Sequence, residues 1–289
     1  MLSDSRIERP PFACEVSAGA VSAARASTKA GEVEIVQSRT LPHGALTPSL
    51  LGQNLMQPEA VRDAIREVVT AVAGAPREVV AIIPDAAARV VLLEFDTLPT
   101  RQDDAEGVIR FRLKKSLPFD VDKSAVSFQA TRTDKQTRVV AAIVLKTVLD
   151  EYEAVFRAAG CQPGVVIPST LAALGAVDAS RPTLLLKIDG ETNSVAIVNE
   201  NQLLLHRTQE GNGELTAERL ADDVYPSLVY FQDTFGVTVE RVLVSGWKDM
   251  AALTPLLAQQ TGARIESMAN AINVSGVRPE ACGAVGALL

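Results

Sequence analysis

The chain has little of the material from which metal centres and disulfide networks are built. It contains only two histidines, His43 and His206, and three cysteines, Cys14, Cys161 and Cys282, which lie far apart. This set leaves almost nothing for a zinc site or for paired-histidine catalysis. An odd number of widely spaced cysteines is typical of buried free thiols in a reducing compartment. We therefore expect no metal site and no disulfide.

Long apolar runs and positive charge are scarce as well. No apolar run approaches the ~20 residues of a membrane span, and the opening stretch MLSDSRIERPPF lacks the apolar core of a signal peptide. The net charge of −7 offers no broad positive field to nucleic acid or to an anionic membrane. These absences favour a cytoplasmic protein without a nucleic-acid partner.

What is present is a large supply of small and aliphatic residues. The 289 residues are 47% hydrophobic but only 4% aromatic, with Ala, Val and Leu providing most of the packing material. This composition favours a globular α/β protein over a β-sandwich. The length is too great for one small core, so we expect two lobes.

The order of the predicted elements occurs twice. Three strand-like runs, an amphipathic helix and a short buried strand follow one another in each half, about 170 residues apart on the pattern of periodicity. In the first half they fall near 13–19, 20–27, 32–41, 58–74 and 78–84, with a further strand near 89–98; in the second they fall near 184–189, 194–199, 203–208, 215–235 and 241–246. The pattern predicts two equivalent lobes that face each other across a cleft, which is a common place for a ligand.

A module of different character separates the two halves. Its pattern is helix, strand, strand, helix and strand, and Asp103 or Asp104 is expected to cap the first helix. We predict a first lobe formed by residues 1–99 and 163–180, an inserted α+β subdomain at 100–162, and a second lobe at 181–289. A final packed helix is expected in PEACGAVGALL.

The inserted module and the segments after it resemble the type IV pilus assembly protein family PilM. The likeness lies in IRFRLKKSLPFDVDKSAVSFQ and in VVAAIVLKTVLDEYEAVFRAAGCQPGVVIPSTLAALGA, and it extends over most of the chain. The resemblance implies an actin-like fold with duplicated ribonuclease H-like lobes and an extra subdomain in the first lobe. It implies a place at the inner face of the inner membrane, where the protein binds the N-terminal cytoplasmic peptide of the bitopic membrane protein PilN. It also implies that Mg-ATP is bound between the lobes.

The first nucleotide motif implied by the resemblance is altered. An actin-like site uses an acid and glycines in its first turn, because glycines let backbone N–H groups approach phosphates and the acid holds the metal. Here the stretch reads CEVSAG, so that Glu15 stands for the acid, Ser17 for the first glycine, and Gly19 is kept. An ordinary hairpin turn explains these small residues equally well.

The second and third motifs are altered as well. In KIDGETNS the expected acid position holds Ile188, while Asp189 and Gly190 follow it; a shift of one residue in a strand turns a side chain to the other face. In VLVSGWKDM the residues Ser245 and Gly246 are present, but Trp247 replaces the second glycine. We expect this indole to fill the space where adenine would lie.

The resemblance further implies several tens of residues between Gly213 and the helix near 215–235, and here almost none intervene. The second lobe is therefore predicted to lack a large insertion. The altered motifs and this gap favour a degenerate nucleotide site, and hence a protein that is not an enzyme. The candidate residues of this site are Glu15, Ser17, Gly19, Asp189, Gly190, Ser245 and Gly246.

The inserted helix offers a candidate partner surface. Phe111 falls outside the apolar stripe of its own helix, and the basic residues Arg112 and Lys115 follow it, before Pro118 and Phe119 at the helix exit. These five residues fit an apolar peptide with a nearby acidic or membrane-proximal segment. A solvated basic face is the structural alternative for the basic residues.

Three functions remain open on the sequence. The favoured one is a cytoplasmic scaffold of a type IV pilus or related secretion platform, which contacts the membrane only through a PilN-like partner and can form homo-oligomers. The second is an ATP-binding switch of the same platform. The third is a sugar-kinase-like or filament-forming actin relative. The altered phosphate turns disfavour a kinase, and the absence of a basic amphipathic extension in PEACGAVGALL disfavours a membrane-bound filament protein.

Overall fold

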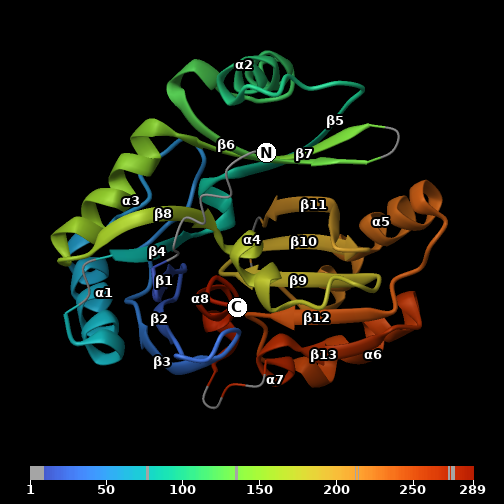
Figure 1. Ribbon diagram of the computed structural model, residues 1–289. Helices are drawn as coiled ribbons and strands as arrows, with labels where there is room; N and C mark the ends of the chain where they lie inside the picture. Colours follow the sequence, from blue (N-terminus) through green and yellow to red (C-terminus); the bar gives the residue numbers. More distant parts are fainter. Residues whose placement is uncertain are drawn as a thin grey trace.

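The computed structural model describes residues 10–75, 78–133, 136–211, 213, 215–272, 274 and 277–289. Within these residues it contains two five-stranded sheets and one three-stranded sheet. Figure 1 shows the two larger sheets beside each other, with the small sheet and one helix lying above them. No described helix has both the length and the apolar character needed to cross a membrane.

The first lobe is built on the sheet β3-β2-β1-β4-β8. Its elements are β1 (Phe12–Val16), β2 (Ala20–Ala26), β3 (Val33–Thr40), α1 (Pro58–Ala73), β4 (Glu78–Ile83), α3 (Lys146–Ala158), β8 (Gln162–Pro168) and the short α4 (Ser169–Ala173). The predicted helix signals of α1 are confirmed, since Pro58 lies in its first turn and Gly74, with a φ of 76°, ends it. Its apolar stripe packs in one core with α3.

The second lobe repeats this plan in the sheet β11-β10-β9-β12-β13. Its elements are β9 (Thr183–Asp189), β10 (Thr192–Asn199), β11 (Gln202–Glu210), α5 (Ala217–Phe235), β12 (Arg241–Ser245), α6 (Met250–Thr261), β13 (Arg264–Ser267), α7 (Met268–Ala271) and α8 (Cys282–Gly286). In both sheets an antiparallel three-stranded meander is followed by two parallel strands. The predicted internal duplication is confirmed at the level of topology.

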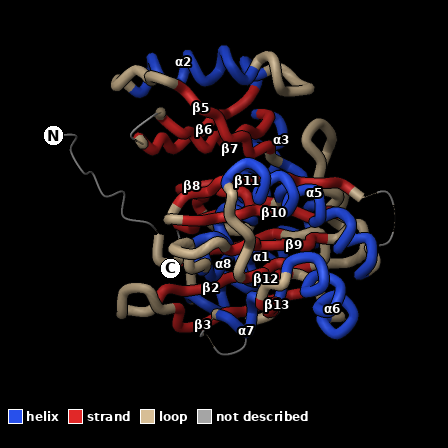
Figure 2. The backbone as a smooth tube through the Cα atoms, turned by 90° about the vertical axis from the view of Figure 1, so that its right-hand side faces the viewer, coloured by secondary structure: helices blue, strands red, loops and turns tan. Residues whose placement is uncertain are grey.

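The small sheet, in the order β5-β7-β6, interrupts the first lobe between β4 and α3. Its elements are β5 (Arg89–Phe95), α2 (Gln102–Leu113), β6 (Ser124–Arg132) and β7 (Thr137–Leu145). The sheet has a core of its own, in which Ile109 and Leu113 of α2 pack on Val139, Ala141 and Ile143 of β7. Figure 2, from the side, shows α2 as the outermost layer above this sheet.

Three details differ from the sequence-based expectations. The strand near 89–98 was expected in the first lobe, but β5 pairs along its whole length with β7. The helix α3 was expected in the inserted module, yet Tyr152 and Phe156 are buried in the first-lobe core. Helix α2 starts after Arg101 without a side-chain cap, so Asp103 and Asp104 lie in its first turn instead. Periodicity identifies an amphipathic segment but not the sheet or core that covers it.

The two lobes share a third core, made where α4 and α8 cross between the sheets (Figure 1). The helices approach closely at Gly286 of α8, because a Cβ there would lie 2.4 Å from the carbonyl oxygen of Ala172 in α4. The three cysteines are buried and free, as expected. The expected terminal helix is present as α8, and all five of its residues are buried.

Candidate functional site

At the centre of the cleft between the lobes lies a buried ion pair. Glu15 of β1 is wholly buried, and its Oε1 lies 2.9 Å from Nζ of Lys187, which comes from β9 of the other lobe. The Ser169 hydroxyl donates to the same oxygen, and the Ala284 backbone N–H donates to Oε2 at 3.0 Å. Both carboxylate oxygens of Glu15 therefore already have partners within the protein, from β9, α4 and α8.

The ion pair determines the charge state of Lys187. Burial alone would lower the pKa of this ammonium group, but the adjacent Glu15 carboxylate outweighs it and raises the pKa above its usual value. Lys187 therefore stays protonated and provides a fixed positive charge between the lobes. A metal ion or phosphate group at this point would have to displace it. No group of three or more metal-ligating side chains is present among the described residues.

A second bond between the lobes uses Asp189. Its Oδ1 accepts a hydrogen bond of 2.7 Å from the backbone N–H of Ala18, in the turn between β1 and β2. The expectation that Asp189 would face away from the cleft is wrong, because Lys187 and Asp189 lie on the cleft side of β9 while Ile188 faces the second-lobe core. Removal from water raises the pKa of Asp189 to about 6, against the opposing effects of Lys187 and the Ala18 N–H.

The turn that would hold phosphates is closed on itself. The Ser17 hydroxyl donates to the Ala20 carbonyl at 2.8 Å and accepts from the Ala20 N–H at 3.2 Å. Gly19 has no positive φ, and a Cβ there would meet nothing within 4 Å. The backbone N–H groups of Ser17, Ala18 and Ala20 thus donate to protein groups, and the conformation of Gly19 does not require a glycine.

The third motif is used for packing. Gly246 has a φ of 83°, and a Cβ on it would lie 1.9 Å from the carbonyl oxygen of Ile188. The hydroxyl of the wholly buried Ser245 donates to the Pro279 carbonyl at 2.8 Å. Trp247 packs against the second-lobe core, and its Nε1 donates to the Asp249 carbonyl. The indole therefore packs at the end of β12, and its place relative to adenine stays a prediction.

The space left in the cleft is small. Its volume is about 190 Å³, and its lining includes five of the seven predicted residues: Ser17, Gly19, Asp189, Gly190 and Gly246. Glu15 and Ser245 lie beneath it and are wholly buried. Sites for drug-sized ligands occupy roughly 300 to 1,000 Å³. The residues present do not fit Mg-ATP, because the acid is already paired, the turn N–H groups are used and the volume is insufficient.

A larger groove of about 480 Å³ lies between the small sheet and the first lobe. Its walls are β6 and β7 on one side, and β8, α4 and the β10–β11 turn on the other. Its apolar lining comes from Val140, Ala142, Val165, Val166, Ile167, Leu171, Leu174 and Leu203. Both β6 and β8 are edge strands of their sheets. The groove thus offers two rows of backbone groups that no other described strand pairs.

One end of the groove is held rigidly. Nη1 of Arg138 donates to Oε1 of Gln202 at 2.7 Å, which joins β7 to the second lobe. The neighbouring turn between β10 and β11 has two non-glycine residues with positive φ, Glu200 at 51° and Asn201 at 59°. The Asn201 N–H donates to the Ala179 carbonyl at 2.8 Å, which fixes this turn. Backbone of this kind is costly and persists where its surroundings enforce it.

The five predicted partner residues lie elsewhere and are not in the groove lining. Phe111 is 69% exposed on the outer face of α2, with Nζ of Lys115 5.9 Å from its ring centre. Arg112 and Pro118 are exposed, and Phe119 packs on the core of the small sheet. Their part in partner binding stays a prediction.

Sequence reasoning missed the groove, although one signal was available. Strand β7 reads TRVVAAIVL and is apolar at odd and even positions alike. Alternate residues of a strand point to opposite faces, so a strand that is apolar at every position indicates a sheet covered on both faces. Val139 and Ala141 face α2, whereas Val140 and Ala142 face the groove.

The paired sheets, the shared core between the lobes and the inserted small sheet define a two-lobed protein of the actin-like class. No protein-family model and no curated protein matches the sequence. Among solved structures, the chain matches PilM in the "PilM-PilN type IV pilus biogenesis complex" at a TM-score of 0.77 and 18% identity, over 96% of this chain and 97% of that one. The predicted PilM-like fold is confirmed.

Two further solved structures share the fold at greater distance. The cytoplasmic domain of EpsL, an inner-membrane component of the type II secretion system of Vibrio cholerae, matches at a TM-score of 0.52 and 12% identity, over 86% of this chain and 93% of that one. The ethanolamine utilization protein EutJ from Carboxydothermus hydrogenoformans matches at a TM-score of 0.53 and 9% identity, over 97% of this chain and 90% of that one. These likenesses concern the fold.

Proposed function

We propose that this chain is a scaffold of a type IV pilus or related secretion assembly platform, and that it works without bound nucleotide. In this proposal the groove between β6 and β8 holds an extended N-terminal peptide of a PilN-like membrane protein. The observation that carries the proposal is the pair of edge strands facing one apolar groove. The likeness to a protein solved in a PilM-PilN complex supports the choice of partner.

The groove suits an extended apolar peptide for two physical reasons. A peptide strand laid along an edge strand obtains its affinity from main-chain hydrogen bonds, and its alternate side chains enter pockets on one side. Val165, Ile167 and Leu171 provide apolar contacts on the first-lobe wall, and Val140 and Ala142 provide them on β7. The walls are preorganised by the Arg138–Gln202 bond, so little ordering is required on binding.

The cleft supports the nucleotide-independent part of the proposal. Lys187 and Glu15 already join the lobes by a buried ion pair, and Asp189 joins them again through the Ala18 N–H. In a nucleotide-driven switch, the ligand must bind one arrangement of the lobes better than another. Here internal bonds hold one arrangement, which disfavours the alternative of an ATP-binding switch of the same platform.

The partner determines the place of the protein in the cell under this proposal. The chain would lie at the inner face of the inner membrane, held there by a membrane protein whose cytoplasmic end occupies the groove. Its acidic net charge of −7 gives it no general attraction for anionic lipid or nucleic acid. Membrane contact would therefore be indirect.

Site-specific photo-crosslinking in the native host tests this proposal. A photo-reactive amino acid at Gln129, an exposed β6 residue in the groove lining, is expected to capture the N-terminal segment of a PilN-like protein. The matched control is Arg132, also exposed on β6 but outside the lining, and it should capture none. A partner captured equally from both positions, or none captured from Gln129, would contradict the proposed site.

A further inference from the structure

The outer face of α2 carries an apolar knob that its own chain does not cover. Phe111 is 69% exposed and Val108 is 38% exposed, although both are large hydrophobic residues. Arg112 and Lys115 lie beside them, and neither forms an ion pair with any described residue. A single exposed hydrophobic residue is common, but an aromatic one flanked by free cations is typical of an interface anchor.

A recess of matching character lies on another side of the molecule. It has a volume of about 450 Å³ and is formed where the β5 edge, β11 and α5 meet. Its apolar lining comes from Leu92, Leu93, Leu203, Leu204, Tyr230 and Phe235. Tyr230 is 55% exposed, and Tyr225 and Val229 continue the exposed apolar surface along α5.

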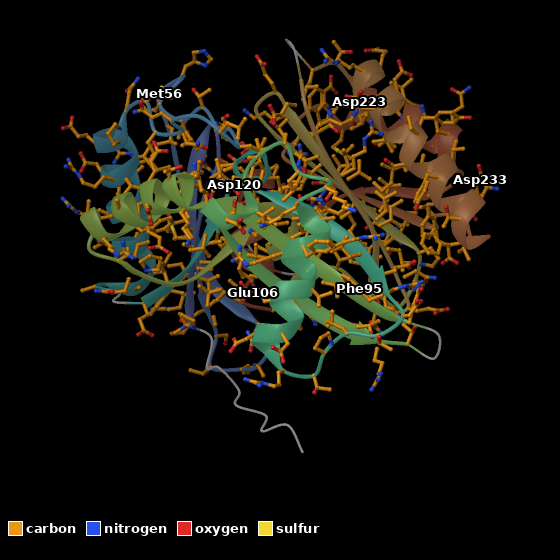
Figure 3. The ribbon with its side chains drawn as sticks, turned by 90° about the horizontal axis from the view of Figure 1, so that it is seen from above. Met56, Phe95, Glu106, Asp120, Asp223 and Asp233 are labelled. Atoms are coloured by element: carbon orange, nitrogen blue, oxygen red, sulfur yellow. The ribbon has the colours of Figure 1, made fainter. Side chains whose placement is uncertain are left out.

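The charges around the knob and the recess are opposite. The exposed face of α5 carries Glu218, Asp222 and Asp233, and none of these is in an ion pair with a described residue. Figure 3 shows Asp233 on α5 at one side of the molecule, apart from Glu106 on α2. Charges that are opposite in sign and unpaired on both surfaces favour association between them and make it sensitive to salt.

We propose that copies of this chain associate head to tail, with Phe111 of one copy in the recess beside Tyr230 of the next. The knob cannot enter the recess of its own chain, because α2 covers the outer face of the small sheet while the recess lies between that sheet and the second lobe (Figure 1). Lys115 and Arg112 then face Asp233 and Asp222. In such a pair, the first copy still has a free recess and the second copy still has a free Phe111. Further copies can therefore add at both ends, which produces a ring or a filament.

Sedimentation of the full chain at low salt tests the proposal. At about 100 μM the wild-type chain is expected to form oligomers that dissociate as salt is raised. The variant Phe111→Glu should weaken association at least about tenfold. The matched control is Leu51→Glu, which changes an apolar residue that is 61% exposed in a different region and should leave association unchanged.

Mixing two variants separates a head-to-tail contact from a symmetric one. Phe111→Glu keeps the recess and Tyr230→Glu keeps the knob, so each alone should be monomeric and the mixture should form a one-to-one dimer. Circular dichroism melting confirms that both variants fold. A wild-type chain that stays monomeric, a Phe111→Glu variant that still associates, or a mixture that stays monomeric would each overturn the proposal.

The two substituted residues lie outside the proposed partner groove, because neither Phe111 nor Tyr230 lines it, although Leu203 borders both the groove and the recess. Both variants should retain the crosslink from Gln129. Loss of that crosslink in the wild-type chain would contradict the proposed function and leave the head-to-tail contact standing. A wild-type chain that stays monomeric but still gives the crosslink would contradict the head-to-tail contact and leave the proposed function standing.

Discussion

The cleft between the lobes and the groove beside the small sheet are both lined by elements of two structural units, but they differ in what their polar groups do. In the cleft, Glu15 pairs with Lys187 and Asp189 accepts from Ala18, within a space of about 190 Å³. In the groove of about 480 Å³, the outer edges of β6 and β8 have no partner strand among the described residues. Unpaired backbone edges are places for a ligand, and satisfied buried groups are not.

The contrast shows that residues at the positions expected for a nucleotide site can instead join two lobes by internal bonds. The positions implied by the PilM resemblance still meet at the cleft, yet a lysine supplies the positive charge there. The buried pair holds the lobes together, and the open groove is left as the larger site between units. Four changes to the chain test this contrast.

The largest effect is expected from breaking the buried pair. Lys187→Met leaves the Glu15 carboxylate buried without its counter-charge, which should cost about 3 to 5 kcal/mol of unfolding free energy in urea titrations. The double variant Glu15→Gln, Lys187→Met should recover most of this loss, because both charges are gone. Lys248→Met changes an exposed lysine of the same cleft and should be neutral. A neutral Lys187→Met would show that the pair does not join the lobes.

The next effect compares two glycines of the cleft. Gly246→Ala should cost at least about 2 kcal/mol, since φ is 83° and the new Cβ would clash with the Ile188 carbonyl. Gly19→Ala should change stability by less than about 0.5 kcal/mol, because a Cβ there meets nothing. Thermal denaturation of both variants measures this, and a large loss from Gly19→Ala would indicate a strained phosphate-type turn.

A third change closes the groove without touching the cleft. Ala142→Trp places an indole in the groove and should weaken binding of the partner peptide at least about tenfold, or ~1.4 kcal/mol, as measured by calorimetry. Ala130→Trp, on the exposed part of β6 outside the lining, is the control and should bind normally. Equal affinities for the two variants would place the peptide elsewhere.

The smallest effect is a dependence on pH that comes from Asp189. Its folded pKa of about 6 lies above the ~3.9 of an unfolded aspartate, so the folded state binds the proton more tightly. This carboxyl therefore destabilises the fold above pH 6, and its penalty disappears as pH falls toward 4. Asp189→Asn should melt higher than the wild type at pH 7, with a difference that shrinks toward pH 4. A difference independent of pH would contradict the assignment.

Most of the fold could be predicted from the sequence, because the local patterns of strands, helices and turns agree with the way these elements pack in the structure. The strand–helix order occurs in both halves, and Gly74 and Gly236 end their helices as backbone freedom requires. Five of the seven residues named from the altered motifs line the cleft between the lobes, because each motif lies at the end of a strand that borders it. These features depend on residues that are close together in the sequence, so they can be predicted from one sequence.

The parts of the fold and of the site that were not predicted depend on contacts between segments that are distant in the sequence. The residues RVVLLEF predict a strand but do not indicate whether it pairs with β7 or with a strand of the first lobe. The apolar face of α3 is likewise compatible with the core of the first lobe and with that of the small sheet. The partner of Glu15 also escaped prediction, since Lys187 is distant in sequence and stands within an apolar run. The groove was missed because it is shared between a small sheet and a lobe that the sequence treats separately.

The central claim is that the partner peptide binds without nucleotide, and one calorimetric titration tests it most directly. A synthetic N-terminal peptide of the PilN-like protein from the same host is titrated into the chain, with and without millimolar Mg-ATP. Binding is expected in both cases, with dissociation constants equal within about twofold. Binding that requires Mg-ATP, or that Mg-ATP strengthens at least about tenfold, would contradict it.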